Sequence, residues 1–261
     1  MMATPEFSQD RPRRVLLLRA PDSPGPDRYE QALAQRGFEA VSAPVLHYDF
    51  VNQDVLRALA ENPRQLAAWI FTSARAVESV ARAAPPGGAD RHRQGVAYVV
   101  GPRTAEAASR LGFHAMGQAS GSASELARFI RAHHDPTNPH PLCFVSGDRR
   151  RHELPDQLEQ AGIAFREIVG YRTRARMPDI DPAGFDAGVW FSPSGVSAVY
   201  VHSGAHDRAA WNSLPSIAIG PTTANALAAA GVPPKAIAAA PTPAAVSEAT
   251  AFLTTTMSRH V

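Results

Sequence analysis

Hydroxyl-bearing residues recur where a short apolar run gives way to a helical pattern. Four such corners are Phe71-Thr72-Ser73, Gly101-Pro102-Arg103-Thr104, Ser192-Pro193-Ser194-Gly195 and Gly220-Pro221-Thr222-Thr223. Serine and threonine side chains at such positions cap free N–H groups of a helix's first turn. The remaining N–H groups and the positive helix end attract carboxylates or phosphates. The corners therefore predict an anion-binding surface, although each one alone is also explained as a plain helix cap.

Arginine and tyrosine side chains lie at the ends of other apolar runs. Arg19 ends the first run of the chain, and Arg149, Arg150 and Arg151 follow a later one. These arginines could add charge-assisted contacts to the same anion, or they could be ordinary solvated surface charges. Tyr171 ends the run FREIVGY. A phenol is protonated at neutral pH, so Tyr171 could donate a proton, but it could also be a packing residue.

Other kinds of chemistry have little support. Cys143 is the only cysteine, which excludes an intrachain disulfide and a multi-thiolate metal site. It lies in the apolar run LCFV, so we expect a buried, unreactive thiol. His133, His134 and His140 lie in the proline-rich stretch HHDPTNPHP, which favours a solvated loop over a metal site. The sequence contains no GxGxxG, GxxxxGK(S/T) or GxSxG motif for a nucleotide or a nucleophilic serine.

The elements that must position these residues alternate regularly along the chain. Short apolar runs bounded by Gly, Pro or Ser are typical of strands buried on both faces of a parallel sheet. We predict strands at Val15–Arg19, Ala40–Val45, Ala68–Thr72, Val96–Val100, Leu142–Ser146, Phe165–Tyr171, Gly188–Ser192 and Ser216–Gly220. We predict helices at Asp27–Arg36, Ala74–Ala84, Thr104–Leu111, Ala123–Ala132, Leu154–Ala161, Gly195–His202, Thr222–Ala230 and Pro243–Thr254. This alternation indicates an α/β fold.

Parts of the chain also repeat one another. VGPRTAEAASRLGF at 100–113 and IGPTTANALAAAGV at 219–232 are identical at six of fourteen positions. LAQRG at 33–37 likewise matches LEQAG at 158–162, each ending a helix with glycine before a strand. Such repeats indicate two similar lobes, although any α/β protein shows loose self-similarity. The four segments are Val15–Leu46, Ala67–Ala132, Leu142–Tyr171 and Phe185–Leu253. Their pairing into lobes is left open by the repeats alone.

Composition narrows the choice of partners and compartment. A length of 261 residues fits one large domain or two small ones. Positive and negative residues number 26 and 24, and no stretch forms the basic stripe of a nucleic-acid-binding protein. Apolar runs such as Val15–Leu18 are far shorter than the roughly 20 residues of a membrane span. Met1–Arg14 lacks the apolar core of a signal peptide and reads as a frayed tail. We expect a cytoplasmic monomer that binds neither nucleic acid nor membrane.

The combination of motifs resembles the uroporphyrinogen-III synthase family, especially its eukaryotic-type members. The motifs are WIFTSARAV, YVVGPRTAEAASRLGF, a strand ending IVGYRT, WFSPSGVSAV, SIAIGPTTANALAAAGV and AAAPTPAAV. The resemblance runs from about Val15 to Leu253. It implies two flavodoxin-like lobes, each a small parallel sheet flanked by helices, joined by a two-stranded linker. It assigns residues 1–46 and 176–261 to one lobe, 50–171 to the other, and 47–49 and 172–175 to the linker.

The resemblance also implies a reaction. Members of the family are lyases of tetrapyrrole (haem) biosynthesis that use no metal or organic cofactor. They close hydroxymethylbilane, a linear tetrapyrrole with eight carboxylates, to uroporphyrinogen III with ring D inverted. The nitrogen of ring A expels the terminal hydroxyl to leave an azafulvene, and ring D attacks through its substituted carbon. The resulting spiro intermediate fragments and recloses with ring D reversed. Such an enzyme needs a proton donor and a surface that positions the substrate.

Site residues carry over from the family by position. Tyr171 matches the tyrosine usually proposed to assist departure of the hydroxide. The matched cleft hydroxyls are Thr104, Ser194, Thr222 and Thr223. We expect further substrate contacts from Arg19, Thr72, Ser73, Arg149, Ser192, Gly195 and Gly220. A bilobal anion-binding or sensor module without catalysis would share these features and stays open as a second class. A carbohydrate- or nucleotide-acting enzyme lacks its expected glycine or carboxylate motifs here.

Overall fold

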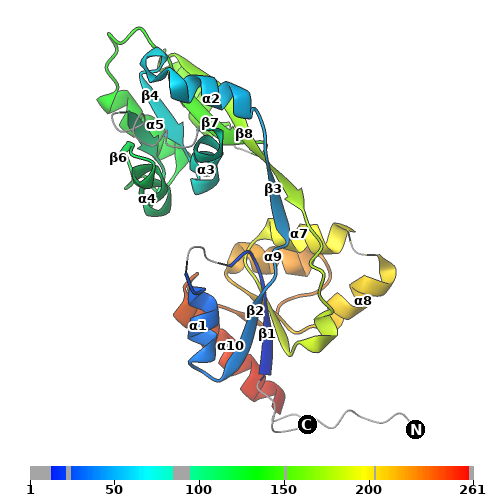
Figure 1. Ribbon diagram of the computed structural model, residues 1–261. Coiled ribbons are helices and arrows are strands. Elements are labelled where there is room, and N and C mark those ends of the chain that lie inside the picture. Colours follow the sequence, from blue (N-terminus) through cyan, green and yellow to red (C-terminus); the bar gives the residue numbers. More distant parts are fainter. Residues whose placement is uncertain (1–12, 22–24, 85–94, 150–151, 203, 259–261) are drawn as a thin grey trace, which may run out of the picture. The chain divides into compact units, whose positions relative to one another are not determined.

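The structure is a computed structural model that describes residues 13–21, 25–84, 95–149, 152–202 and 204–258 (Figure 1). Most of the predicted N-terminal tail, together with Arg150 and Arg151, lies outside these residues. The described chain divides into two compact units. Unit 1 comprises the chain up to His47 and from Arg174 onward, and unit 2 comprises Tyr48–Thr173. The chain passes from one unit to the other after His47 and again after Thr173.

Unit 1 is a five-stranded sheet with the strand order β11-β10-β9-β1-β2, and its neighbouring strands pair in parallel. Its strands are β1 (Arg13–Leu18), β2 (Phe38–Ser42), β9 (Ala187–Trp190), β10 (Ser216–Ala218) and β11 (Ala236–Ile237). Its helices are α1 (Arg28–Ala34), α7 (Pro193–His202), α8 (Ala205–Ser213), α9 (Pro221–Ala229) and α10 (Pro243–Ser258), with a short 3-10 turn, η3 (Pro182–Gly184).

Unit 2 is built on a six-stranded sheet with the strand order β3-β8-β7-β4-β5-β6. Its strands are β3 (Leu46–Phe50), β4 (Ala68–Phe71), β5 (Val96–Val99), β6 (His114–Met116), β7 (Leu142–Gly147) and β8 (Phe165–Ala175). Its helices are α2 (Gln53–Glu61), α3 (Ala74–Ala83), α4 (Pro102–Arg110), α5 (Ala123–His133) and α6 (Glu153–Gln160), with the 3-10 turn η1 (Pro63–Gln65). Strands β3 and β8 carry the chain across the boundary between the units.

The two sheets have one topology, and this settles how the repeated segments pair. The order β8-β7-β4-β5-β6 in unit 2 corresponds to β2-β1-β9-β10-β11 in unit 1. Counted in chain order, unit 1 has the order 2-1-3-4-5 of a flavodoxin-like fold. Unit 2 has the same arrangement in circularly permuted form, because β7 and β8 follow β4, β5 and β6 in the chain. The first repeated segment therefore joins the fourth, and the second joins the third. The predicted α/β class with two similar parallel sheets is confirmed.

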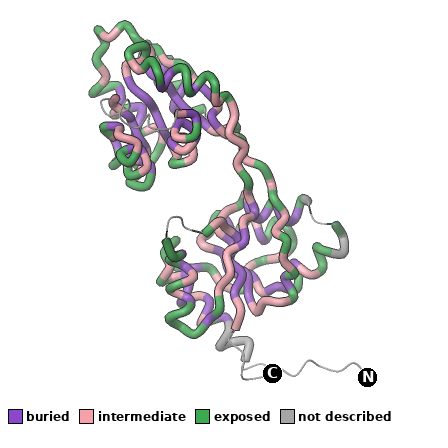
Figure 2. The backbone as a smooth tube through the Cα atoms, viewed as in Figure 1, coloured by how far each residue is buried: buried purple, intermediate pink, exposed green. Residues whose placement is uncertain are grey.

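Burial on both faces explains why the strand sequences are continuously apolar. In β1, Val15 and Leu17 pack into one core cluster of unit 1, whereas Leu16 and Leu18 pack into the cluster on the other face. Unit 2 likewise has a cluster on each face of its sheet. Figure 2 shows buried residues running through the middle of each unit and exposed residues along the segments around them. Helices must cover both faces, which is the arrangement that a parallel sheet requires.

The differences from the predicted elements have local causes. Strand β2 ends at Ser42 rather than Val45, because Pro44 has no N–H with which to continue a ladder. The prediction missed β6 and β11, which have only three and two residues. It also missed α2 and α8, which lie in stretches that the prediction left unassigned.

Gly117, which follows β6, gives a direct test of how unit 2 packs. Its φ is +81°, and an added Cβ would lie 2.8 Å from Leu126 Cδ1 in α5. We predict that Gly117→Ala destabilises unit 2 by about 1–3 kcal/mol, because it combines backbone strain with overpacking. Gly95→Ala is the matched control, since its Cβ would make an ordinary 3.6 Å contact with Phe113.

Urea unfolding followed by tryptophan fluorescence measures this effect. Trp69 reports on unit 2, whereas Trp190 and Trp211 report on unit 1. Gly117→Ala should lower the urea midpoint of the Trp69 signal relative to Gly95→Ala, and the midpoint of the unit 1 signal should be the same in both variants. Equal midpoints for the two alanine variants would contradict the predicted packing at Gly117.

Candidate functional site

Each of the four predicted corners joins the carboxyl end of a strand to the start of a helix. Thr72 and Ser73 join β4 to α3, and Gly101 lies between β5 and α4. In unit 1, Ser192 lies between β9 and α7, and Gly220 lies between β10 and α9. Since β4 and β5 correspond to β9 and β10, the corners occupy matched places in the two sheets. Ligands of open α/β sheets bind beyond such strand ends.

Two of the corners hold serine caps. Ser73 Oγ accepts the N–H of Ala76 at 3.2 Å, and Ser192 Oγ accepts the N–H of Gly195 at 3.1 Å. Gly195 is buried, and a Cβ there would lie 3.0 Å from Val45 Cγ2. Glycine therefore allows α7 to approach the chain after β2. Ser194 is half-buried in the first turn of α7.

The other two corners have the sequence Gly-Pro and lack a side-chain cap. Helices α4 and α9 begin at Pro102 and Pro221, and neither helix receives a capping hydrogen bond from a side chain. Proline removes one N–H that would otherwise be unsatisfied, but the following N–H groups of the first turn stay available. Among the predicted hydroxyls here, Thr222 is exposed, whereas Thr104 and Thr223 are only 5% and 3% exposed.

The predicted arginines differ in their surroundings. Arg19 forms an ion pair with Asp27 at 2.6 Å, and its guanidinium stacks 5.0 Å from the ring centre of Tyr29 and 5.3 Å from that of Phe191. The buried Asp27 carboxylate also caps α1. Arg19 is thus built into unit 1 and is not a solvated surface charge. Arg149 is exposed directly after β7 in unit 2.

Tyr171 lies in β8 of unit 2, beside one of the serine corners. Its hydroxyl is hydrogen-bonded to Ser73 Oγ at 3.0 Å, and either oxygen can be the donor. Its ring makes an edge-to-face contact with Tyr48, with 5.9 Å between the ring centres. Burial raises the pKa of Tyr171 above its ordinary value, and the hydrogen bond from Ser73 partly opposes this. The structure therefore brings Ser73 and Tyr171 together, and the phenol stays protonated at neutral pH.

Sequence reasoning missed the residues around this tyrosine. The Arg75 guanidinium lies 4.5 Å from the ring centre of Tyr48 and forms an ion pair with Glu78. Although burial opposes it, hydrogen bonds from Arg75 and Arg82 lower the pKa of Glu78. Arg75 and Glu78 are three residues apart in a predicted helix, and this spacing alone indicates an ion pair. The position of Tyr48 depends on the pairing of β3 with β8. The resemblance implied linker strands at 47–49 and 172–175, but it assigned no role to Tyr48.

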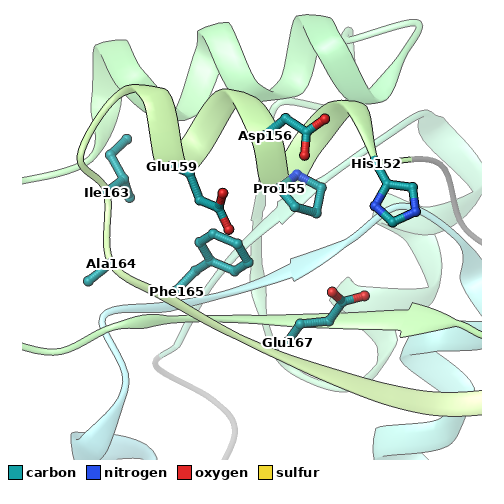
Figure 3. Close-up of a pocket in the computed structure, with 8 residues that line it drawn as sticks. All are labelled: His152, Pro155, Asp156, Glu159, Ile163, Ala164, Phe165 and Glu167. Carbon is teal, nitrogen blue, oxygen red and sulfur yellow. The ribbon is translucent and has the colours of Figure 1, made fainter.

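A separate hollow in unit 2 lies between α6 and β8 (Figure 3). Asp156 and Glu159 project from α6, and Glu167 extends from β8, with His152 at the start of the helix. Glu167 accepts a hydrogen bond from Ser146 at 2.7 Å. None of the site residues predicted above is among those lining this hollow. Its carboxylates would repel a polycarboxylate ligand.

Cys143 behaves as its sequence context predicts. It lies in the centre of β7 and is fully buried. Burial raises the pKa of its thiol to about 12. The expected burial of Cys143 is confirmed, and because the thiolate is the reactive form, the raised pKa supports an unreactive thiol.

Other site types find no support within the described parts of the chain. No helix there is long and apolar enough to cross a membrane. The same residues contain no group of three or more His, Cys, Asp or Glu side chains arranged to hold a metal ion.

The chain is similar to known proteins in both sequence and structure. Residues 27–248 match the family described as "Uroporphyrinogen-III synthase HemD". A curated Saccharomyces cerevisiae protein, "Uroporphyrinogen-III synthase", is 31% identical over 235 residues, which covers 80% of this chain and 85% of the relative.

Two solved structures are similar to the chain over most of its length. The uroporphyrinogen-III synthetase of Helicobacter pylori aligns with a TM-score of 0.61 and 17% identity, covering 92% of this chain and 99% of that one. A mutant uroporphyrinogen III synthase of Thermus thermophilus aligns with a TM-score of 0.51 and 18% identity, covering 95% and 99%. At these identities, the two likenesses show a shared fold.

Proposed function

The chain belongs to the uroporphyrinogen-III synthase family, and on this premise we propose that it converts hydroxymethylbilane to uroporphyrinogen III. The reaction closes the linear tetrapyrrole with inversion of ring D and loss of water. The observation that carries the proposal is the family match over residues 27–248, which extends through both units. The hydrogen-bonded pair of Tyr171 and Ser73 supplies the acid that the reaction needs.

We assign the first proton transfer to Tyr171. The ring A nitrogen pushes electrons toward the terminal carbon, whose C–O bond breaks while the phenol protonates the departing oxygen to give water. The resulting azafulvene is attacked by the substituted carbon of ring D, which forms the spiro intermediate. Fragmentation and reclosure reverse ring D, and the proton then lost from carbon restores the phenol. Because burial raises the pKa of Tyr171, the acid is fully protonated at neutral pH.

The corners are the proposed binding points for the carboxylates of the substrate. The uncapped first turns of α4 and α9 present N–H groups at a positive helix end. Thr222 and Arg149 are exposed and can add side-chain contacts. A carboxylate at Arg19 would share the guanidinium with Asp27. Thr104 and Thr223 are buried, so their proposed role is to support their corners.

The remaining assignments follow from the proposed reaction. The substrate is a small molecule, and no nucleic-acid or membrane partner is required. We propose that the protein works as a monomer in the cytoplasm. A bilobal anion-binding module without catalysis is the other candidate, and the family match does not favour it.

An isomer assay separates the two functions. The purified chain is mixed with freshly prepared hydroxymethylbilane, and the oxidised products are resolved chromatographically. We expect uroporphyrinogen III in excess over the isomer that forms without the enzyme, because positioning of ring D decides which carbon reacts. A product mixture identical to that of the buffer blank would refute the synthase assignment and support the binding module.

Removing the Tyr171 hydroxyl tests its assignment as the acid. We predict that Tyr171→Phe lowers kcat by about 10²–10⁴-fold, the usual contribution of a general acid. Tyr98→Phe is the matched control, since Tyr98 is a buried tyrosine of the same unit that lies in β5 and packs against Phe129. A loss smaller than tenfold, or about 1.4 kcal/mol, would make the proton transfer from Tyr171 a minor contribution.

A further inference from the structure

We propose that Gly147, Gly170 and Ser73 form a seat that positions the phenol of Tyr171. In this seat, Gly147 determines how closely the ring approaches the backbone of β7. This inference rests on the proposed function, because it assigns these residues a role through the acid. It differs from the sequence expectation for Ser73, which was a contact with substrate. The three residues come from β7, β8 and the start of α3.

The first part of the seat is an irregularity in the pairing of β7 and β8. Ser146 lies opposite Val169, but the next residue, Gly147, lies opposite Tyr171, so β8 contains one extra residue at Gly170. An extra residue interrupts the alternation of side chains and re-aims the next one. Tyr171 accordingly packs against the same core cluster as Ile168, three residues earlier. In regular pairing, residues three apart point to opposite faces of a sheet.

This face of the sheet carries α3. Val77 and Val80 of α3 belong to the cluster that Ile168 and Tyr171 contact. The backbone at Gly170 also approaches α3 closely, since a Cβ there would lie 2.4 Å from Ser79 Oγ. The extra residue therefore brings the phenol to the side of the sheet where Ser73 caps the helix.

The second part of the seat is the missing side chain of Gly147. A Cβ at this position would lie 2.6 Å from Cζ of Tyr171 and 2.8 Å from its hydroxyl oxygen. The φ of Gly147 is not left-handed, so the backbone itself would accept alanine. The obstacle is the ring, whose hydroxyl end lies directly against the backbone of β7. Any side chain at position 147 must push the phenol away.

The third part of the seat holds the hydroxyl from the other end. Ser73 Oγ accepts the N–H of Ala76 and is thereby fixed to the first turn of α3. The 3.0 Å bond to Tyr171 then defines where the phenolic oxygen lies. Relieving a 2.6 Å contact to the ordinary 3.4 Å needs a shift of several tenths of an ångström. A misplacement of about 1 Å in a catalytic group can cost about 10²-fold in rate.

A double-mutant cycle measures the role of Gly147 in catalysis. We expect Gly147→Ala to lower kcat about 10–10²-fold, while Gly95→Ala leaves kcat unchanged. In a Tyr171→Phe background, Gly147→Ala should lower kcat little further, because the hydroxyl that it displaces is already absent. A Gly147→Ala enzyme with wild-type kcat, or losses that simply multiply in the double variant, would overturn the positioning role.

A second readout reports the phenol itself and does not depend on activity. The chain has five tyrosines, so ¹³Cζ-tyrosine labelling gives few signals, and Tyr171→Phe identifies that of Tyr171. We expect Gly147→Ala to shift this signal and to move the Tyr171 pKa down toward its ordinary value, because the displaced ring is less buried. Gly95→Ala should leave both unchanged. An unaltered Tyr171 signal in Gly147→Ala would refute the seat.

Ser73→Ala tests the other end of the seat, and it provides the test if Gly147→Ala does not fold. Its matched control is Ser122→Ala, because Ser122 caps a different helix, α5, in the same way, by accepting the N–H of Glu125 at 3.2 Å. Both variants lose a helix cap, but only Ser73→Ala should shift the Tyr171 signal. The same Tyr171 signal in Ser73→Ala and Ser122→Ala would refute the seat. Full activity of Tyr171→Phe would refute the acid role instead, and the spectra would still decide whether the seat exists.

Discussion

A phenol ring that lies against the backbone of a neighbouring strand is the contact on which the proposed chemistry depends. Tyr171 reaches that place because β8 has one residue more than β7 requires and because residue 147 has no side chain. The hydroxyl then meets a serine that is already fixed as a helix cap. The extra residue and the missing side chain belong to the backbone of unit 2, and the serine side chain is itself fixed to the backbone of α3.

The parallel sheets impose the rest of the arrangement. A strand buried on both faces must be followed by a helix that covers one of them, so helix N-termini gather at the carboxyl edge of each sheet. A net charge of only +2 is low for the proposed substrate with its eight carboxylates. In the proposed function, the uncapped first turns at Pro102 and Pro221 attract these carboxylates through the partial positive charge of the helix ends, which the formal net charge does not include. The duplicated topology provides such turns in both units.

The sequence predicted those features that follow from periodicity and local chemistry. Strand and helix alternation, the repeated segments and the four corners are local patterns, and each corresponds to an element of the structure. Tyr171 and Ser73 were both singled out, but their hydrogen bond joins residues that are far apart in the chain. Arg19 could be a contact for the anion or a solvated surface charge on its sequence alone, whereas the structure pairs it with Asp27. The seat at Gly147 depends on strand register, which a single sequence does not encode locally.

The claim that Tyr171 donates the proton is tested most directly by the pH dependence of a single turnover. Enzyme in excess over hydroxymethylbilane is quenched at successive times between about pH 6 and about pH 11.5, with the activity recovered on return to neutral pH as the check on integrity. Since the acid must be protonated and burial raises its pKa, the rate should stay constant through the ordinary tyrosine range near pH 10 and fall only above it. Tyr171→Phe should be slow and lack this fall. An alkaline fall that is the same in both proteins would contradict the role of Tyr171 as the acid.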